Sequence, residues 1–179
     1  MIDRRLALAL ATVTLTACSS SDPGVSGGTS NGNGNGGSSG STSGDGTTGT
    51  ATEALQHCVD AINTYRAKVG ATAYTRTSAL ETYAAAGAQS DGSTGSAHGH
   101  FGATEGGHGI AFAENELPGW ARAHYTSMDD LIDQGMAAMW SEGPGGGHYD
   151  NMTSKDYTQA GCGVYTTSTN AVWVTIDFR

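Results

Sequence analysis

Residues 161–178, GCGVYTTSTNAVWVTIDF, carry the clearest strand pattern of the chain. In the second half of this stretch every other side chain is large and apolar: Val172, Val174, Ile176 and Phe178. Because neighbouring side chains of a strand point to opposite faces, this set shares one face and the residues between them share the other. The first half, residues 161–167, is rich in β-forming types, and the Ser-Thr-Asn segment at 168–170 suits a tight connection. The stretch therefore predicts an antiparallel hairpin.

Two helices are predicted upstream of this hairpin. The first begins at the capping box TATE, residues 50–53, and ends at Gly70, which is free to adopt the left-handed conformation. Its apolar side chains recur at helical spacing: Leu55, Cys58, Ile62, Tyr65 and Val69. A second capping box, SALE at residues 78–81, begins a helix that continues through an alanine-rich stretch to about residue 90.

A third helix is predicted to begin at Ser127. Asp129 and Asp130 lie in its first turn, where the positive end of the helix dipole favours acidic side chains. Its apolar stripe predicts these core residues: Met128, Leu131, Ile132, Met136, Met139 and Trp140. Residues 91–125, in contrast, are rich in Gly and His and show little periodicity, so we expect an irregular segment there. Helices followed by late strands predict an α+β domain.

Size, charge and cysteine content limit the class of the protein. Its 179 residues predict one domain with appendages. It carries 8 basic against 17 acidic residues. This balance excludes nucleic acid as a partner, because phosphate binding needs clustered Lys and Arg. Three cysteines are too few for a disulfide-dense miniature scaffold or for a metal site of four thiols.

The N-terminal segment has the pattern of an export signal. Arg4 and Arg5 precede a short apolar run, residues 6–15, which is too short to span a membrane as a helix. The run ends in Leu15-Thr16-Ala17-Cys18, which resembles the lipobox of bacterial lipoproteins. The resemblance implies that residues 1–17 are removed as a signal peptide and that a diacylglyceryl group on Cys18 holds the protein on a membrane. The alternative is an ordinary secretory signal with an incidental thiol.

The segment after Cys18 differs in composition from the rest of the chain. Ser19, directly after the cysteine, favours the outer membrane over the inner one in a Gram-negative host. Residues 18–50 consist almost entirely of Ser, Gly, Thr and Asn, and so little apolar surface cannot offset the entropy lost on ordering. We therefore expect residues 18–50 to be a disordered tether. Residues 51–179 would then form a globular domain held at the bacterial outer membrane or cell surface.

Histidine and glutamate residues in loop-like sequence are the candidates for chemistry. They are His98, His100, His108, His148, Glu114 and Glu142. Neutral imidazole and carboxylate are ligands of zinc, and the same groups act as acid and base. No His-Glu-x-x-His motif is present, so the spacing by itself does not define a metal site. A cation held by the His98-x-His100 pair with Glu105 and His108 is an alternative arrangement.

Six short motifs follow one another along the globular part: Asn63-x-x-Arg66, His98, Ala113-Glu114-Asn115, Trp140-x-Glu142, Gly147-His148-Tyr149 and Ala160-Gly161-Cys162-Gly163. In this order they resemble the CAP superfamily, which contains cysteine-rich secretory proteins, antigen 5 and plant pathogenesis-related proteins, and whose module is also called the SCP domain. The resemblance covers about residues 54–179. It implies a three-layer α-β-α sandwich with a central antiparallel sheet and a cleft that contains two His and two Glu.

The resemblance also implies which residues form the cleft. Matched motif by motif, they are His98, Glu114, Glu142 and His148. In the family the two histidines can hold a divalent cation, often zinc, so zinc or another divalent cation is expected at His98 and His148. His100, two residues further on, is the alternative first histidine. The chain departs from the family pattern at Ala113, where Gly is usual, and after Tyr149, where Asp150-Asn151-Met152 stands in place of the usual Thr-Gln-Val-Val-Trp.

Cys58 and Cys162 are the thiols that remain if Cys18 is lipidated. In an exported protein an even pair predicts a disulfide, which closes a loop of about 100 residues. Cys58 points inward on the first helix and Cys162 begins a core strand, so two separate buried thiols are the alternative. The rich disulfide set that is usual in the family is absent.

Three functions are compatible with these residues. The first is a surface-tethered binding module whose cleft takes a cation, a small or lipid-like ligand or a cell-envelope partner. The second is a zinc-dependent hydrolase, a peptidase or amidase, in which His98 and His148 hold the metal and Glu142 or Glu114 acts as base. The third is a non-catalytic structural or interaction protein. The sequence has no recognisable Ser or Cys nucleophile motif, and two His are fewer than the three protein ligands usual in catalytic zinc sites, which favours binding over catalysis.

Overall fold

The computed structural model describes residues 51–179, so the predicted signal peptide (1–17), the lipidation of Cys18 and the tether (18–50) lie outside the described residues. The elements, in chain order, are α1 (Ala51–Lys68), β1 (Thr75–Arg76), α2 (Ser78–Thr94), α3 (Gly99–Gly109), β2 (Ala113–Ala121), a 3-10 turn (Arg122–His124), α4 (Met128–Ser141), α5 (Gly147–Thr153), β3 (Gln159–Thr166) and β4 (Ala171–Phe178). The predicted C-terminal hairpin is confirmed as β3 and β4.

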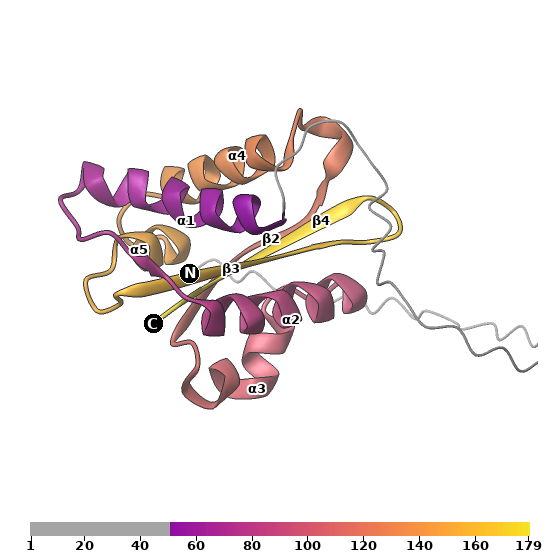
Figure 1. Ribbon diagram of the computed structural model, residues 1–179, viewed down its shortest axis with the longest axis horizontal. Helices are drawn as coiled ribbons and strands as arrows, with labels where there is room; N and C mark the ends of the chain where they lie inside the picture. The colour runs from indigo at the N-terminus through magenta and orange to yellow at the C-terminus, as the bar shows by residue number, and fades with distance from the viewer. Residues whose placement is uncertain (1–50) are drawn as a thin grey trace, which may run out of the picture. The chain divides into compact units, whose positions relative to one another are not determined.

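The described residues form three layers (Figure 1). Helices α1, α4 and α5 cover one face of the sheet, and α2 and α3 cover the other. The strands lie in the order β1-β3-β4-β2, so β2 is an edge strand. β4 pairs antiparallel with both β2 and β3. The expected α+β sandwich is confirmed, with one correction: the sheet is mixed, because the two-residue β1 runs parallel to β3.

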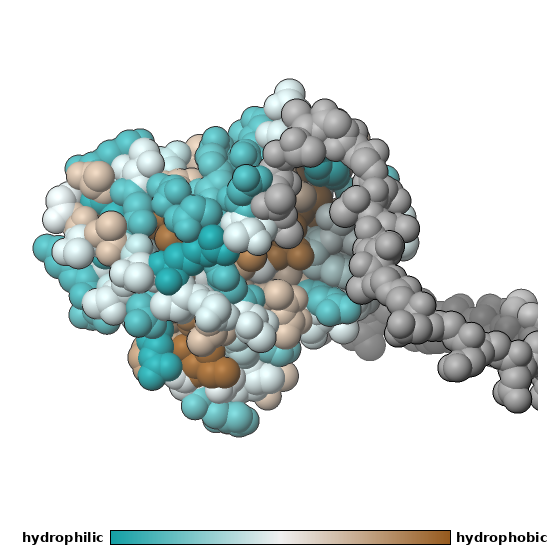
Figure 2. Space-filling model, in the orientation of Figure 1, coloured by the Kyte–Doolittle hydropathy of each residue, from teal (hydrophilic) through white to brown (hydrophobic). Residues whose placement is uncertain are grey.

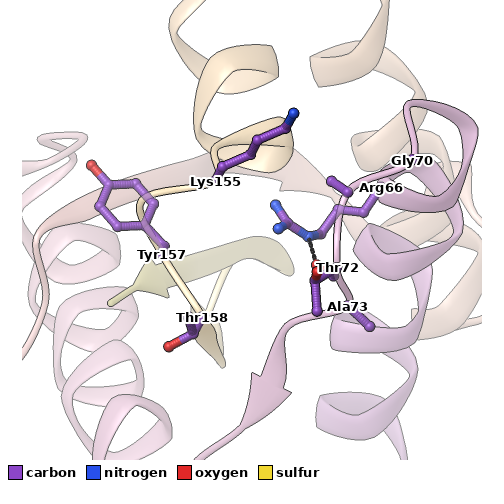
Figure 3. A pocket seen from close by; sticks show the side chains of 8 residues that line it. Arg66, Gly70, Thr72, Ala73, Lys155, Tyr157 and Thr158 are labelled. Atoms are coloured by element: carbon purple, nitrogen blue, oxygen red, sulfur yellow. Dashed lines mark hydrogen bonds between the residues drawn. The ribbon is translucent and has the colours of Figure 1, made fainter.

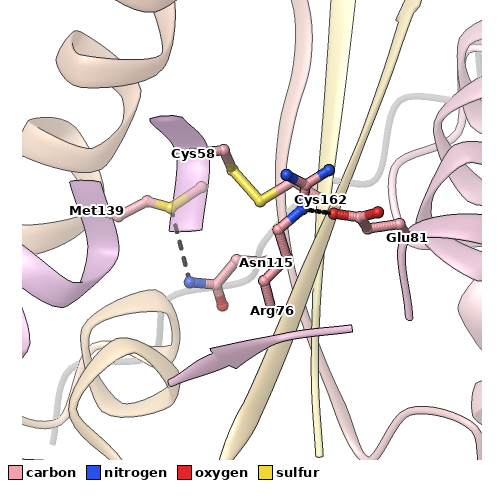
Figure 4. The surroundings of a disulfide bond; sticks show 6 residues. All are labelled: Cys58, Arg76, Glu81, Asn115, Met139 and Cys162. Atoms are coloured by element: carbon pink, nitrogen blue, oxygen red, sulfur yellow. Dashed lines mark hydrogen bonds and ion pairs between the residues drawn. A yellow bond between two sulfur atoms is a disulfide. The ribbon is translucent and has the colours of Figure 1, made fainter. Parts of the chain in front are cut away.

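The main hydrophobic core lies between the sheet and α1 and α4. The apolar face of β4 contributes four fully buried side chains: Val172, Val174, Ile176 and Phe178. Cys162 on β3 shares this face and forms a disulfide with Cys58 on α1 (Figure 4), which confirms the predicted pair. The bond links positions 104 residues apart and ties α1 to the middle of the sheet.

The second helical layer packs directly on β3 through two glycines. A Cβ atom added to Gly161 would lie 2.5 Å from Cβ of Leu80, and one added to Gly163 would lie 2.2 Å from the carbonyl carbon of Ala84. Side chains at these two positions would therefore push α2 off the sheet. This close approach also buries the α2 residues that face the sheet, among them Gly87 and Asp91.

Helix starts agree with the sequence in one case and differ in another. Ser127 is the N-cap of α4, and its hydroxyl accepts a hydrogen bond from the backbone N–H of Asp130, as predicted. The capping box predicted at residues 78–81 is wrong, because Thr77 is the N-cap of α2 and makes no side-chain cap. Glu81 instead forms an ion pair with Arg76.

The irregular segment expected over residues 91–125 is also wrong, because it contains the end of α2, all of α3 and β2. Glycines and polar residues hide these elements from a search for apolar periodicity. Residues 105–108 form a left-handed turn inside α3, with φ between 50° and 65°. In β2 the side chains that face α2 are Glu114 and Glu116 rather than apolar residues, so the strand lacks the usual alternation.

On the face drawn in Figure 2, most of the described residues are hydrophilic or of intermediate hydropathy, and the brown areas are small and separate. Three large apolar residues are exposed: Val69, Ile110 and Phe112. Between residues 51 and 179 there is no helix with the length and hydropathy that crossing a membrane requires.

Candidate functional site

The edge strand β2 connects the two helical layers through adjacent side chains. Glu114 points toward α3, where its Oε1 lies 2.8 Å from Nδ1 of His98. The next residue, Asn115, points to the opposite face and donates from Nδ2 to the backbone carbonyl of His148 at 3.0 Å. Alternation along one strand thus places one histidine from each layer at the same sheet edge.

His98 is held at the start of α3 by backbone and side chain. It is the N-cap residue and adopts a left-handed conformation, with φ 58°. Its backbone N–H donates to Oε2 of Glu116 at 2.7 Å. The imidazole side chain is 47% exposed, whereas Glu114, its partner, is 1% exposed. The buried carboxyl group of Glu114 therefore orients a ring that faces solvent.

His148 is held by Glu142 in a similar way from the other layer. Its backbone N–H donates to Oε2 of Glu142 at 3.1 Å, and its Nδ1 lies 2.5 Å from Oε1 of the same carboxylate. The loop approaches closely here, since a Cβ on Gly146 would lie 2.4 Å from Cβ of Glu142. The hydrogen bond from His148 lowers the pKa of Glu142, so this group is a carboxylate at neutral pH.

The two imidazoles stack against each other at the edge of β2. Their ring centroids lie 6.4 Å apart, with an angle of 29° between the planes. Each ring uses Nδ1 for a carboxylate, so Nε2 is the nitrogen left to meet a ligand. The structure therefore brings together His98, Glu114, Glu142 and His148, which are far apart in the sequence.

His100, the alternative first histidine, lies deeper and does not pair with His148. Its ring packs on Tyr83 with the centroids 4.9 Å apart, and its backbone N–H donates to Oδ1 of Asp91 at 2.7 Å. The alternative arrangement that includes Glu105 and His108 receives no support, because the group of close metal-ligand atoms found within residues 51–179 contains neither.

That group contains Glu116, which the sequence reasoning missed. One ligand atom each from His98, Glu114 and Glu116 lie within 4.8 Å of one another. Burial, reinforced by Asp91, raises the pKa of Glu114 to about 8. Burial also raises the pKa of Glu116, to about 7, against the opposing hydrogen bond from the His98 backbone. Glu114 and Glu116 are two residues apart, and in a strand this spacing places both side chains on one face. That spacing is the sequence signal that could have identified Glu116.

The Asn63-x-x-Arg66 motif has a structural role. Arg66 is 1% exposed and donates to the carbonyl oxygens of Thr72, Met152 and Ser154. Figure 3 shows its guanidinium turned toward Thr72, at a cavity of about 370 Å³ that Lys155 and Tyr157 also line. A second cavity, of about 380 Å³, is lined by His57 and Asp133 among others. Neither cavity includes the paired histidines.

Comparison with protein families gives one match. The family model "CAP: Cysteine-rich secretory protein family" matches residues 59–178. No curated protein is similar enough in sequence to count as a match.

Two solved structures match this chain. One, titled "Crystal structure of NaASP2 with Zn2+", has a TM-score of 0.56 at 17% identity, over 75% of this chain and 83% of that chain. The other is a cysteine-rich secretory protein from Staphylococcus aureus subsp. aureus Mu50, with a TM-score of 0.47 at 15% identity. The match covers 71% of this chain but 38% of the S. aureus chain. With the family model matched over most of its described residues, this chain belongs to the cysteine-rich secretory protein (CAP) family.

Proposed function

We propose that this protein is an exported CAP-domain binding protein whose His98 and His148 hold a divalent cation, with zinc the preferred ion. The observation that carries the proposal is the arrangement of the two rings. They face each other, and the carboxyl group of a glutamate fixes each at Nδ1. In zinc sites the ligating histidine commonly donates its other ring N–H to a carboxylate, which fixes the tautomer and raises the basicity of the ligating nitrogen.

The donor set fits zinc better than a harder cation at this position. Imidazole nitrogen is a ligand that zinc favours, and the metal lies about 2.0–2.1 Å from it. Two histidines leave coordination positions that a ligand's polar group or water can take. The zinc named for the solved NaASP2 structure supports this choice for a chain of the same fold.

Binding is favoured over hydrolysis by the state of the two glutamates. Both oxygens of Glu142 already accept from His148, one from its backbone and one from its ring. Glu114 has a side chain that is 1% exposed, so water does not reach it freely. A general base must be free to take a proton from an attacking water, and neither glutamate is free in this way. We therefore expect a small or lipid-like ligand, or a cell-envelope partner, rather than a peptide or amide substrate.

Export is supported by the family and by the disulfide. The matched family is one of secretory proteins, and disulfides form and persist outside the reducing cytosol. Attachment to a membrane through a lipid on Cys18 remains our proposal from the Leu15-Thr16-Ala17-Cys18 motif, and so does the bacterial outer membrane or cell surface as its location. Incorporation of a palmitate analogue by cells that express the full chain, and its loss in Cys18→Ala, tests this.

Zinc binding is tested by calorimetric titration of the full chain. We expect saturable binding that weakens at least about a hundredfold in His148→Ala, because one of two nitrogen ligands is lost. His124→Ala, at an exposed histidine outside the site, is the matched control and should bind as the wild type does. Equal zinc affinity in His148→Ala and wild type would refute the proposed site. Metal-dependent hydrolysis of peptides or amides that is lost in Glu142→Gln would favour the hydrolase instead.

A further inference from the structure

A layer of acidic side chains lies on the face of the sheet that α2 covers. Glu114 and Glu116 of β2 pair directly with Asp177 and Thr175 of β4, respectively. Paired residues of antiparallel strands share a face, with their Cβ atoms about 4.5–5.5 Å apart. The four side chains therefore form a compact square, and all four residues are buried. We call this square, together with Asp91, the acidic layer.

Helix α2 closes the acidic layer from the other side. Asp91 is fully buried and acts electrostatically on both Glu114 and Glu116. One turn earlier, at Gly87, the backbone leaves room above the layer. A Cβ at Gly87 would lie 3.5 Å from Cγ2 of Thr175, 3.6 Å from Nδ1 of His100 and 3.7 Å from Oε2 of Glu114. Groups from α3, β2 and β4 thus converge on one point beneath the helix.

Most polar side-chain atoms of this layer, and one of the neighbouring His100, have no hydrogen-bond partner among the described residues. They are Oδ2 of Asp91, Nδ1 of His100, Oε2 of Glu114, Oε1 of Glu116, Oγ1 of Thr175 and both carboxylate oxygens of Asp177. Thr175 and Asp177 have no exposed surface, and Thr175 stands on the same face as its neighbour Glu116. Buried polar atoms are nearly always partnered, so a concentration of unpartnered acceptors points to a missing cationic partner.

Among the described residues, no Lys or Arg side chain is seen to neutralise the negative charge of the acidic layer. Within residues 51–179, the hydrogen bonds and electrostatic interactions of the four carboxyl groups involve His98, His100, Tyr83 and one another, and no Lys or Arg. Carboxylates that lie close together repel one another, so ionisation of each carboxyl group in the layer is disfavoured and its pKa rises. The pKa of Asp177 is accordingly raised to about 8, by burial first and then by Glu114 and Glu116.

We propose that the acidic layer is a second cation site, in which a hard, oxygen-preferring divalent cation draws together the carboxyl groups of Asp91, Glu114, Glu116 and Asp177. Within residues 51–179, the group of close ligand atoms contains Glu114 and Glu116, which meet at His98, so Asp91 and Asp177 must turn toward the cation as it binds. Thr175 supplies a hydroxyl oxygen and His100 an imidazole nitrogen. Carboxylate-rich donor sets favour Mg²⁺, Ca²⁺ and Mn²⁺, and the added imidazole makes Mn²⁺ the best probe. A bound cation would replace the protons that the layer otherwise keeps and would partner its oxygens.

This site is separate from the histidine pair. It uses neither His148 nor Glu142, and its ligands lie beneath α2 rather than at the solvent-facing rings. Glu114 belongs to both, with Oε1 turned to His98 and Oε2 turned into the layer. Variants of Asp177 and of His148 therefore distinguish failure of this proposal from failure of the zinc proposal.

The test is a titration of the full chain with Mn²⁺, followed by the electron paramagnetic resonance signal of the free ion. We expect saturable binding in wild type and in His148→Ala. In Asp177→Asn and Glu116→Gln we expect affinity to fall at least tenfold. Both substitutions keep the side-chain shape, and the amide oxygen at position 116 can still accept the N–H of His98. Asp156→Asn, at an exposed carboxylate, is the matched control and should leave the affinity unchanged.

Thermal unfolding with and without Mn²⁺ gives a second readout. The melting temperature should rise with Mn²⁺ in wild type but not in Asp177→Asn, whose melting temperature in chelator should be at least that of wild type. Displacement of bound Mn²⁺ by Ca²⁺ supports oxygen ligation. Absence of saturable Mn²⁺ and Ca²⁺ binding overturns the proposal. So does Mn²⁺ binding that is lost in His148→Ala and kept in Asp177→Asn, because the cation would then sit only at the histidine pair.

Discussion

Glu114 and Asp177 pair directly across β2 and β4, and burial raises the pKa of each carboxyl to about 8. Each group therefore keeps its proton in the folded chain over a pH range in which the unfolded chain has lost it. The two residues lie on the edge strand and its neighbour, in a sheet whose opposite face is largely apolar. A fold that buries acids here must keep the carboxyl groups neutral or bind a cation, and pH separates the two cases.

Without metal, stability should fall as the pH rises. The unfolded carboxyls lose their protons near their ordinary values, 3.8 for Asp and 4.5 for Glu, whereas the folded ones hold them to about 8. The folded state binds more protons between these limits, so the free energy of unfolding decreases with pH across that window. In chelator we expect the melting temperature to drop by more than about 5 °C between pH 5 and pH 8. A melting temperature that rises over this range contradicts the expectation, and Asp177→Asn should flatten the curve.

Glu142→Gln should weaken zinc binding without unfolding the protein. The carboxylate holds His148 by two hydrogen bonds and lies at the surface, where an amide fits equally well. Loss of such an orienting carboxylate costs about 10–100-fold in metal affinity. Calorimetry measures the change, with Glu105→Gln, an exposed glutamate outside the site, as control. A variant with wild-type affinity would mean that Glu142 does not position the ring.

The sequence predicts the layers well and the site partly, for identifiable reasons. The hairpin of β3 and β4 follows from the alternation of Val172, Val174 and Ile176, because those side chains face a core. β2 was missed because two of its four buried positions are Glu114 and Glu116, whose burial depends on partners from α2 and β4. Local periodicity cannot report partners that are distant along the chain.

The choice between His98 and His100 illustrates the same limit. Both lie in the same Gly-rich stretch, and the spacing from other motifs does not separate them. The structure separates them through a backbone feature: His98 adopts φ 58° at the start of α3, which directs its ring to the sheet edge. Left-handed conformations of non-glycine residues are uncommon and have no reliable sequence signal at a histidine.

Removal of the disulfide should be the most destabilising change to α1. The bond between Cys58 and Cys162 spans 104 residues, and in the chain-entropy model such a loop contributes about 4–5 kcal/mol. The double variant Cys58→Ala and Cys162→Ala should lower the free energy of unfolding by at least about 3 kcal/mol in urea titrations, since two buried side chains also shrink. The wild type unfolded in reducing agent is the control. Equal stability of oxidised wild type and double variant would contradict the assignment.

Two serines test the helix starts. Ser127→Ala should cost about 1 kcal/mol, because the hydroxyl caps α4 by accepting from the Asp130 N–H at 3.0 Å. Ser78→Ala should cost less than about 0.5 kcal/mol, because the N-cap of α2 is Thr77 and Ser78 is exposed in the first turn. Urea unfolding of both variants gives the comparison. Equal costs would show that the cap geometry does not decide these helix starts.

Two glycines at the contact between α2 and the sheet, Gly163 on β3 and Gly87 on α2, should respond oppositely to substitution by alanine. At Gly163 the new Cβ would lie 2.2 Å from the backbone of Ala84, and backbone cannot move aside without lifting α2 from β3. Gly163→Ala should therefore destabilise the protein by about 2 kcal/mol or more. At Gly87 the nearest atoms lie 3.5–3.7 Å away, which is ordinary contact, and alanine is the better helix former by up to about 1 kcal/mol. Gly87→Ala should be neutral or stabilising in chelator, and a large loss of stability there would mean that α2 lies closer to the acidic layer than the structure places it.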